Sequence, residues 1–450
     1  MNLGTNNKLQ KKGITLVIPN PCGNIKETKM KNSGVEWIGE IPENWESIRL
    51  KYIYSTTKAK LPKQFYDDKN LTPYLSMDFI RDSINTEPVY AKDGDYCSEE
   101  DILILWDGSN AGEIVFNHPA GYAPSTTAIL KKLSTQSLPV YDKFYLKALE
   151  DELRRNTNGM GIPHVNGSYL NNSLFLLPPK STQQRIATYL DKKCSKIEET
   201  IQNQQQVIEK LKAYKQSLIT EAVTGKIKIK NGKVCGEYES YKDSGVEWIG
   251  KIPSEWEVKK LKFSSQIMRG LFSHRPRNDP DYYDGVHPFI QTGEVARAVK
   301  YITTYSQTLN ELGFSVSREF PAGTVLLTIA ANVGDVAILD FNACFPDSVI
   351  GFYPKENVSK IFMFYVLKSM KEQFMRNAII STQMNLNINI VKEEFIPLPS
   401  LAEQKEIVKF LEKKSDYIDT AIEQKQKLIE KLTEYKKSLI YECVTGKKEI

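Results

Sequence analysis

Basic and amide side chains gather in short polar loops of this 450-residue chain. The densest loop, MRGLFSHRPRND, places three arginines, a histidine and an asparagine within ten residues. Arginine can donate two hydrogen bonds to a guanine edge, asparagine and glutamine can pair with adenine, and lysine mostly meets phosphate. These residue types therefore predict contacts to nucleic acid. The candidates in this loop are Arg269, His274, Arg275, Arg277 and Asn278.

Further polar loops extend the candidate set over both halves of the chain. One basic segment precedes an aromatic pair, two loops (DGSNAG and AANVG) form the tips of expected hairpins, and two more (NTNGMGIPHVNG and STQMNLNIN) come late in each half. Any single residue among them is better explained as solvated surface, so only the set as a whole supports nucleic-acid binding. The candidates are Lys58, Lys60, Lys63, Gln64, Asn110, Asn158, His164 and Asn166 in the first half, and Asn332, Gln383, Asn385 and Asn387 in the second.

Motifs of catalysis and cofactor binding are absent from the sequence. No GxxxxGK[ST] phosphate loop and no GxSxG nucleophile elbow occur, and Gly159-Met160-Gly161 is better read as a turn in a polar loop. The four histidines are isolated, and the six cysteines are scattered without a CxxC pair, which predicts free thiols. We therefore expect a binding protein with no catalytic residues, no metal site and no cofactor of its own.

Composition describes a soluble chain. Hydrophobic residues make up 41% and charged residues 26%, and the net charge of +5 is too small to indicate an anionic partner without local basic patches. No stretch approaches the ~18 apolar residues of a membrane span, and the N-terminal apolar run of about five residues is too short for a signal peptide. The expectation is a cytoplasmic protein that does not contact membrane.

Two long stretches must position the polar loops. Residues 179–223 and 401–444 contain no glycine and no internal proline, and each carries an apolar stripe spaced by three and four residues or multiples of these. Such a narrow stripe predicts a long helix that needs a partner helix. Because the second stripe repeats the first at a constant offset of 221, we expect one coiled coil within the chain. The alternative is that each helix packs on its own globular neighbour. The stripes are Ile197, Ile201, Ile208, Leu211 and Leu218, and Ile418, Ile422, Ile429, Leu432 and Leu439.

The whole chain reads as a tandem duplication. KNSGVEWIGEIPENWE at 31–46 returns as KDSGVEWIGKIPSEWE at 242–257, and the helices end in EAVTGK and ECVTGK. Between these segments each half has an expected hairpin, a further strand, a helix (141–155 or 359–376) and a final strand, which indicates a mixed α/β or α+β domain of about 150 residues. The matched tryptophans are expected to be structural anchors. Framework segments repeat almost verbatim while the polar loops diverge, as two readers of different half-sites on duplex DNA would.

These repeated segments, together with the entries LPPKSTQQRIATYL and LPSLAEQKEIVKFL, resemble the specificity (S) subunit of Type I restriction-modification systems. The resemblance covers roughly residues 31–450 and rests on three motifs in the same order, twice. It implies two target recognition domains, related by an internal pseudo-two-fold repeat and joined by an antiparallel coiled coil. It also implies that the chain reads a bipartite, asymmetric site on double-stranded DNA, without catalytic residues. The corresponding division is a leader at 1–30, recognition domains at 31–178 and 236–399, and conserved regions with the long helices at 179–235 and 400–450.

The resemblance implies partners as well. Two modification (methyltransferase) subunits would attach and carry S-adenosylmethionine, and restriction subunits would add ATP- and Mg-dependent translocation and cleavage. Two other classes stay open at this point. A coiled-coil scaffold would assemble partners without reading DNA, and a stand-alone nuclease or methyltransferase would turn over substrate by itself.

Overall fold

The computed structural model describes residues 29–450 except 83, 160 and 381–383. Contacts divide the chain into two compact units. Unit 1 comprises residues 1–200 together with 431–450, and unit 2 is the continuous stretch 201–430. Both boundaries fall inside the long helices, so each unit contains a part of both helices.

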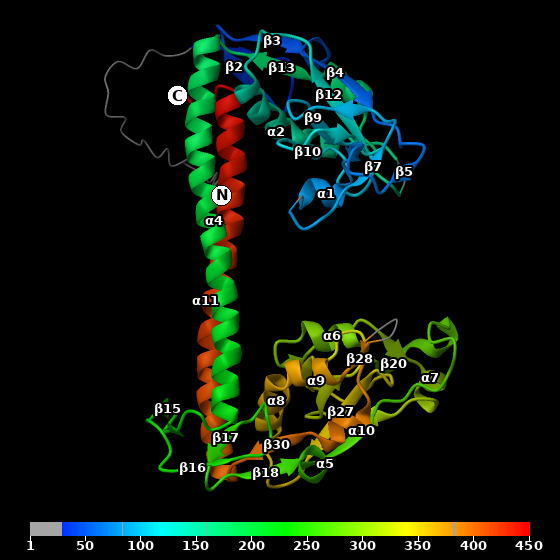
Figure 1. Ribbon diagram of the computed structural model, residues 1–450, viewed down its shortest axis with the longest axis vertical. Helices are drawn as coiled ribbons and strands as arrows, with labels where there is room; N and C mark the ends of the chain where they lie inside the picture. The colour runs from blue at the N-terminus through cyan, green and yellow to red at the C-terminus, as the bar shows by residue number, and fades with distance from the viewer. Residues whose placement is uncertain (1–28, 83, 160, 381–383) are drawn as a thin grey trace, which may run out of the picture. The chain divides into compact units, whose positions relative to one another are not determined.

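Unit 1 is built on two small sheets, and Figure 1 labels all four strands of the first and strands β5 and β7 of the second. The first has the order β10-β9-β12-β4 with antiparallel neighbours throughout, and the second has the order β5-β7-β6-β11-β8. The predicted hairpin after residue 102 is confirmed as β9 and β10. All four residues of β9 are buried, as expected of a short, continuously apolar strand in the interior. The elements of unit 1 outside the long helices are β1 (Met30–Asn32), β2 (Glu40–Pro42), β3 (Glu46–Arg49), β4 (Tyr54–Lys58), β5 (Phe65–Tyr66), β6 (Thr72–Tyr74), α1 (Met77–Arg81), β7 (Val89–Ala91), β8 (Tyr96–Cys97), β9 (Ile102–Leu105), β10 (Ile114–Val115), β11 (Gly121–Tyr122), β12 (Thr127–Lys132), α2 (Pro139–Arg155), α3 (Gly167–Asn172) and β13 (Leu174–Leu177).

Helix α2 joins the core of unit 1 to the chain that enters the first long helix. Pro139 occupies its first position, where the missing N–H is not needed. Tyr141 and Tyr145, four residues apart on one face, are fully buried against Phe175 of β13. Because β13 pairs with β3, this core also holds the opening segment of the unit.

Unit 2 repeats the first sheet with one added strand. Its order β19-β27-β24-β25-β21 matches β4-β12-β9-β10, and β21 joins β25 in parallel. The predicted helix 359–376 is wrong in one detail, because Met370 ends α8 and α9 begins at the next residue. Helix α8 covers this sheet through contacts with β24, β25 and β27. The elements of unit 2 outside the long helices are β14 (Ile229–Lys230), β15 (Lys233–Val234), β16 (Tyr241–Asp243), β17 (Lys251–Pro253), β18 (Glu257–Lys260), α5 (Leu261–Ser264), β19 (Ser265–Arg269), β20 (Tyr283–Pro288), α6 (Thr292–Arg297), β21 (Tyr301–Ile302), β22 (Thr308–Leu309), α7 (Glu311–Ser315), β23 (Glu319–Phe320), β24 (Val325–Thr328), β25 (Val336–Leu339), β26 (Ala343–Cys344), β27 (Val349–Pro354), α8 (Lys360–Ser369), α9 (Lys371–Asn377), β28 (Ile379–Ile380), β29 (Met384–Asn385), α10 (Ile388–Glu393) and β30 (Phe395–Leu398).

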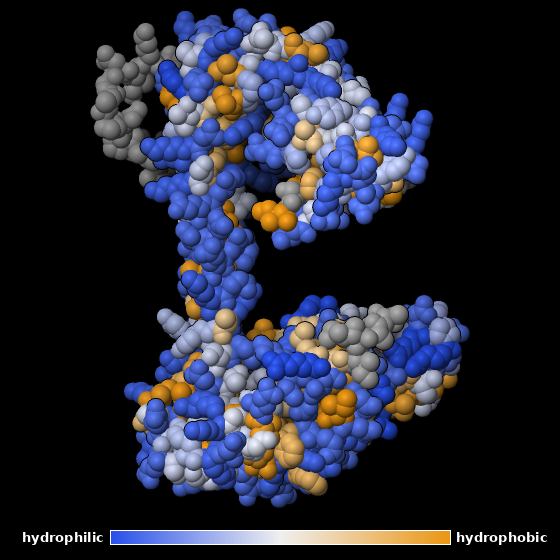
Figure 2. All heavy atoms as spheres, viewed as in Figure 1, coloured by the Kyte–Doolittle hydropathy of each residue, from blue (hydrophilic) through white to orange (hydrophobic). Residues whose placement is uncertain are grey.

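The two long helices are α4 (Lys180–Val223) and α11 (Leu401–Val444), each of 44 residues. Their predicted extents are confirmed to within one residue. All ten residues of the predicted stripes are buried or half-buried. Hydrophilic side chains cover most of the helix surface that faces the viewer in Figure 2.

Two polar contacts between the long helices of unit 2 show that the helices run in opposite chain directions there. In unit 2, Lys215 Nζ lies 2.6 Å from Asp419 Oδ2, and Lys425 Nζ donates to Gln204 Oε1 at 3.0 Å. From Gln204 to Lys215 the chain advances along α4, whereas the partner on α11 moves back from Lys425 to Asp419. In unit 1, Lys436 forms an ion pair with Glu198. The two contacts of unit 2 support an antiparallel arrangement of its helix segments.

Each unit is closed by the end of a long helix and by a tryptophan segment. The helix ends turn at glycines with positive φ, 70° at Gly225 and 73° at Gly446. A Cβ at Gly446 would lie 2.3 Å from the Pro42 ring, and one at Gly225 would lie 2.4 Å from the Pro253 ring. Glycine is therefore required at both positions by the backbone and by the close approach. The end of α11 thus packs on the opening segment of unit 1, and the end of α4 packs on that of unit 2.

A buried glutamine marks the start of each long helix. Gln183 and Gln404 are 1% and 0% exposed. Gln183 accepts from the Leu138 N–H and donates to the carbonyls of Gln136 and Pro178. Gln404 makes the same three kinds of bond, with Ser359, Asn357 and Pro399. Each side-chain amide is satisfied, and the loop before α2 or α8 is tied to the long helix that follows in the same unit.

Candidate nucleic-acid interface

In unit 1, the turn after β9 and the late polar loop meet. His164 exchanges backbone hydrogen bonds with Asn158 at 2.7 and 2.8 Å and forms an isolated bridge with Asp107. Gly108 N–H donates to the Pro163 carbonyl at 3.0 Å, which holds the turn against the loop. Two segments that are about fifty residues apart in the sequence thus form one surface at the end of the sheet.

Asp107 is the charged centre of this surface. Its carboxylate lies 2.9 Å from Lys58 Nζ, at the end of β4, and 2.6 Å from His164 Nδ1. Burial alone would raise the pKa of the Asp107 carboxyl, but the hydrogen bonds from Lys58 and His164 outweigh it and hold this pKa below its usual range. Asp107 is therefore an anion at neutral pH, and it holds two of the predicted DNA-contacting side chains.

The remaining candidates of unit 1 fall into two groups. Asn158 is exposed and Asn110 is half-buried in the turn after β9, so both belong to the surface around Asp107. Asn166 borders it, but its Oδ1 accepts the Tyr169 N–H at 3.0 Å as the N-cap of α3. The second group, on the link from β4 to β5, is exposed and braced through its backbone or side chain by nearby polar groups. It consists of Lys60, Lys63 and Gln64, whose partners are Asp95, Asp93 and Tyr66.

In unit 2, three arginines converge on Asp347. Arg269 Nε donates to the Asp347 carbonyl at 2.5 Å, Arg275 Nη2 lies 3.3 Å from its carboxylate, and Arg277 Nη2 contacts the other carboxylate oxygen. Arg269 is the last residue of β19, whereas the other two come from the loop that follows. Asp347 itself lies just before β27. The predicted arginine cluster is therefore brought together by a residue some seventy positions away in the chain.

Other candidates of unit 2 lie around the same edge or serve the fold. His274 is stacked on Tyr282 with ring centroids 3.8 Å apart, and its Nε2 lies 3.0 Å from Asp279. Asn278 and Asn332 are exposed. Asn385 is exposed and forms a bridge with Ala330, next to the turn that carries Asn332. Asn387 caps α10 by accepting the Asn389 N–H at 2.8 Å, and Gln383 lies outside the described residues.

Both surfaces occupy the same end of equivalent strand pairs. In unit 1, Leu105 at the end of β9 pairs with Thr127 at the start of β12. In unit 2, Thr328 at the end of β24 pairs with Val349 at the start of β27. We call the loops at these ends the reading edges: the Asp107 edge of unit 1 and the Asp347 edge of unit 2.

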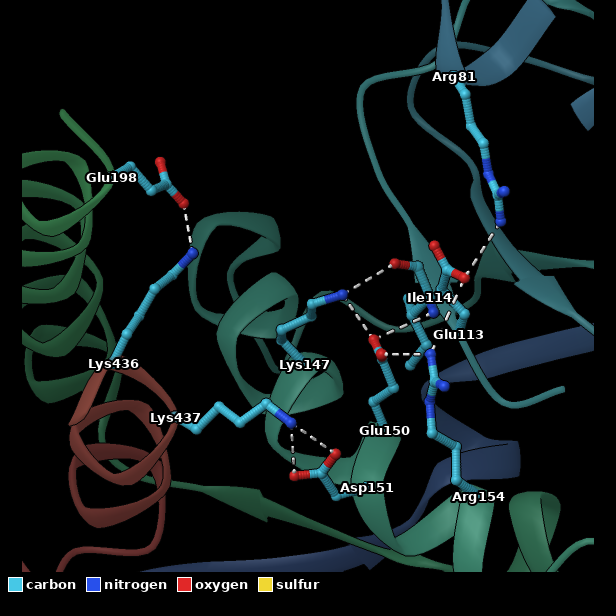
Figure 3. Close-up of polar contacts among 10 residues, drawn as sticks. All are labelled: Arg81, Glu113, Ile114, Lys147, Glu150, Asp151, Arg154, Glu198, Lys436 and Lys437. Atoms are coloured by element: carbon cyan, nitrogen blue, oxygen red, sulfur yellow. Dashed lines mark hydrogen bonds and ion pairs between the residues drawn. The ribbon is translucent and has the colours of Figure 1, made fainter. Parts of the chain in front are cut away.

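A second surface lies beside the tryptophan of the repeated SGVEWIG segment. In unit 1, a pocket of about 370 Å³ is lined by Trp37, α2 and the last turns of α11. Figure 3 shows the charged side chains around it: Lys437 of α11 contacts Asp151 of α2, and Lys147 contacts Glu150. Tyr441 donates to the Trp37 carbonyl at 2.7 Å. The pocket therefore joins framework residues to the long helices and not to the divergent loops.

Unit 2 has a pocket at the matching place, of about 790 Å³. It is lined by Trp248, α9 and the last turns of α4, including Glu221 and Lys371. The Trp248 Nε1 atom is buried and has no hydrogen-bond acceptor among the described residues. The SGVEWIG turns beside both pockets have the same internal bonds, including Gly39 N–H to the Val35 carbonyl and Gly250 N–H to the Val246 carbonyl, each at 2.8 Å.

Several residues that organise these surfaces were missed from the sequence. Asp107 and Asp347 are single carboxylates in polar loops, and no local pattern separates them from solvated residues. The buried glutamines Gln183 and Gln404 had a usable signal, because they keep the 221-residue offset of the helix stripes. Within the described ranges, no group of three or more His, Cys, Asp or Glu side chains is arranged to hold a metal ion. The helices described there include none long and apolar enough to cross a membrane. The five cysteines in the described part of the chain are free thiols, and Cys22 lies outside it.

The chain has two mixed α/β units. Each presents a polar edge where a carboxylate contacts cationic side chains, and this arrangement defines a protein with two recognition domains. The family model of the Type I restriction modification DNA specificity domain matches residues 42–212 and again residues 253–434. The chain therefore belongs to the family of Type I restriction-modification DNA specificity domains, and DNA specificity is its role. This result confirms the resemblance that the repeated segments carried.

Similar proteins match over almost the whole chain. The specificity subunit of the Type I restriction enzyme MjaVIII of Methanocaldococcus jannaschii is 29% identical over 435 residues, which are 90% of this chain and 93% of that protein. The EcoBI specificity subunit of Escherichia coli is 23% identical and covers 94% of this chain and 90% of its own length. A solved chain from a study of complex assembly in the type I R-M system aligns with a TM-score of 0.66 at 14% identity, covering 91% of this chain and 99% of that chain. The fold is shared with that structure.

Proposed function

We propose that this chain reads a bipartite, asymmetric site on double-stranded DNA, with one recognition domain for each half-site. The observation that carries the proposal is the pair of reading edges. Each gathers cationic and amide side chains, from segments far apart in the chain, at the same end of an equivalent strand pair. Arginine and amide groups can read base edges in the major groove, and the lysines of the β4–β5 link suit phosphate. The residues of the two edges differ, so the two half-sites would differ.

The tandem architecture fits this proposal. The two units have matching sheets, matching buried glutamines and matching SGVEWIG turns, which supports a duplicated domain with an internal pseudo-two-fold repeat. The buried stripes and the opposed polar contacts of α4 and α11 support an antiparallel coiled coil that joins the two domains. We also propose a cytoplasmic location, where cellular DNA and the partner subunits would be reached.

The salt dependence of binding tests the DNA-reading proposal. A complex of this chain with its modification subunits should shift a cognate duplex, and the logarithm of the binding constant should fall steeply and linearly with the logarithm of salt concentration. Release of counterions from contacted phosphates causes this dependence, with a slope of roughly −0.9 per phosphate neutralised. A gel shift at increasing salt provides the measurement. An absent or salt-insensitive shift would favour a coiled-coil scaffold, and turnover by the purified chain alone would favour an enzyme.

We propose that the two tryptophan pockets dock the two modification subunits. A partner that attaches twice needs the same surface twice, and the SGVEWIG segment is identical in both units whereas the reading edges diverge. Each pocket is lined by a tryptophan and an arginine, Trp37 with Arg155 and Trp248 with Arg376, and these residue types are enriched in binding hot spots. S-adenosylmethionine would be carried by these subunits, and ATP and Mg by restriction subunits.

Truncation of a pocket tryptophan should release one partner. We expect Trp248→Ala to weaken the binding of one of the two modification subunits by ~2 kcal/mol or more, because a central aromatic anchor is lost. Native mass spectrometry of the complex near its dissociation midpoint should then show one modification subunit instead of two. Phe263→Ala is the matched control, since Phe263 is a large exposed side chain of the same unit. Two tightly held subunits on a folded Trp248→Ala chain would contradict docking at this pocket.

A further inference from the structure

Each reading edge is organised around one carboxylate. Asp107 holds Lys58 from the end of β4 and His164 from the late loop, and Asp347 holds Arg275 and Arg277 from the loop after β19. In both units, therefore, an acidic residue, which phosphate would repel, holds together basic side chains from separate segments of the chain.

The two carboxylates belong to different strands of the equivalent strand pairs. Asp107 stands two residues after the end of β9, and Asp347 stands two residues before the start of β27. Strand pairing puts both positions at the same end of the equivalent strand pairs. The position that corresponds to Asp347 in unit 1 is Ser125, and the one that corresponds to Asp107 in unit 2 is Ala330. The carboxylate is thus not inherited from a shared framework position. It follows β9 in unit 1 and precedes β27 in unit 2, yet it lies at the same end of the strand pair in both units.

The hydrogen bonds of the Asp347 edge divide its arginines by role. Arg275 Nη1 donates to the carbonyls of Phe272 and His274 at 2.6 and 2.7 Å, and its Nη2 faces Asp347. Three hydrogen bonds of this guanidinium thus go to its own loop and to Asp347. Arg277 makes one side-chain contact among the described residues, through Nη2 to Asp347, and its side chain is 45% exposed. Its other N–H groups are available to a ligand, which suits a bidentate contact to guanine.

Charge and order favour this arrangement for reading bases. Three guanidinium groups against one carboxylate leave a net charge of +2 on the Asp347 cluster, so attraction to DNA is kept. A free arginine side chain loses rotamer freedom when it binds, and a carboxylate that already orients it reduces that loss. An anion beside the bases also disfavours loose contact with phosphate, which lowers non-specific binding.

We propose that Asp107 and Asp347 are positioning residues that hold the basic side chains of the two reading edges in place for base contact. The inference rests on the DNA-reading function proposed above. The expected effect of losing such a residue differs from that of losing a residue that only stabilises the fold. Loss of the carboxylate should lower discrimination between DNA sequences in one half-site while binding to unrelated DNA stays equal or rises.

The test uses the full complex with its modification subunits and the isosteric variant Asp347→Asn. Two quantities are measured at fixed salt: the ratio of affinities for cognate and scrambled duplexes, and the sequences methylated in a random library. We expect the affinity ratio to fall about tenfold, the size of a lost bidentate base contact. The relaxed positions should lie in one half-site, and Asp107→Asn should relax the other half. Asp340→Asn is the control, because it removes an exposed carboxylate of the same unit that is not part of the Asp347 cluster.

Each outcome bears on the inference. An unchanged ratio and unchanged methylated sequences in a folded Asp347→Asn complex would overturn it, as would relaxation of both halves by this one substitution. If the Asp347→Asn complex does not assemble, the Arg277→Lys complex is tested instead. This substitution keeps the positive charge but removes the guanidinium group that can make a bidentate contact. We expect Arg277→Lys to relax the same half-site with unchanged affinity for scrambled DNA, and unchanged specificity would overturn the inference. A wild-type complex that fails to discriminate any sequence refutes the DNA-reading function instead.

Discussion

Replacing Ile208 and Ile429 together with aspartate should separate the long helices and abolish assembly with partner subunits. Both side chains are buried in the apolar stripes, at 6% and 8% exposure. An unpaired charge at such a position costs roughly 3–5 kcal/mol, a large part of the stability of a domain. Since both proposed pockets are closed by the ends of these helices, their separation should also disturb docking. Gel filtration of the co-expressed subunits is the measurement, and we expect the complex peak to be lost.

Neighbouring residues on the same helices provide the control. Val207 and Leu428 immediately precede the stripe positions but are exposed at 36% and 42%. The double variant Val207→Asp with Leu428→Asp makes the same change in charge on the outer faces, so it should assemble as wild type. A stripe variant that elutes as an intact complex would count against helix pairing. Equal loss in both variants would show that charge on the helices, not burial, governs assembly.

Exchanging residues 260–400 for the corresponding segment of another specificity subunit should change one half of the methylated sequence and leave the other half intact. The exchanged segment contains the whole Asp347 edge, including the arginine loop and Asn385. Its joints fall at the end of β18 and just before α11, so the SGVEWIG turn, the buried Gln404 and both helices stay native. Base-modification mapping of DNA from cells that carry the hybrid complex measures the result. The effect should be complete, because every predicted base contact of unit 2 is replaced.

Two checks accompany this experiment: comparison with the donor subunit's own methylated sequence, and exchange of the Asp107 edge of unit 1. The new half should equal one half of the donor's own methylated sequence, and exchange of the Asp107 edge should change the half that the first hybrid preserved. Change of both halves by a single exchange would contradict independent reading by two domains. Loss of all methylation would point to failed assembly, which gel filtration of the hybrid complex distinguishes.

Sequence spacing was sufficient for the elements whose pattern is local. The stripes at three- and four-residue intervals predicted α4 and α11 to within one residue, and the apolar runs around DGSNAG and AANVG predicted the hairpins β9–β10 and β24–β25. The repeated segments indicated a duplicated domain and its family. These features succeed because helix and strand periods are set by backbone geometry over a few residues. The break of the predicted helix at Met370 was not visible, since its apolar pattern continues through the break.

The candidate site was predictable only as a set of residue types. Polar loops rich in arginine, lysine and amides marked both edges, but their composition could not separate base contacts from structural roles. Asn166 and Asn387 have the same residue type and loop context as Asn158 and Asn385, yet their side chains cap α3 and α10. A cap depends on where a helix begins, and short helices of six residues leave little trace in the sequence.

By itself the sequence determined the duplicated order of elements, the two long helices and the kind of ligand that the loops suit. Tertiary structure alone decided which loops meet. Asp107 contacts Lys58 and His164 because β9, β12 and β4 are neighbours in one sheet, and Asp347 reaches Arg269 because β27 pairs with β19. It also decided that the end of α11 closes unit 1 and the end of α4 closes unit 2. The physical reason is that secondary-structure periods arise from neighbours in the chain, whereas a charge cluster between distant loops arises from strand order and register, which no local pattern encodes.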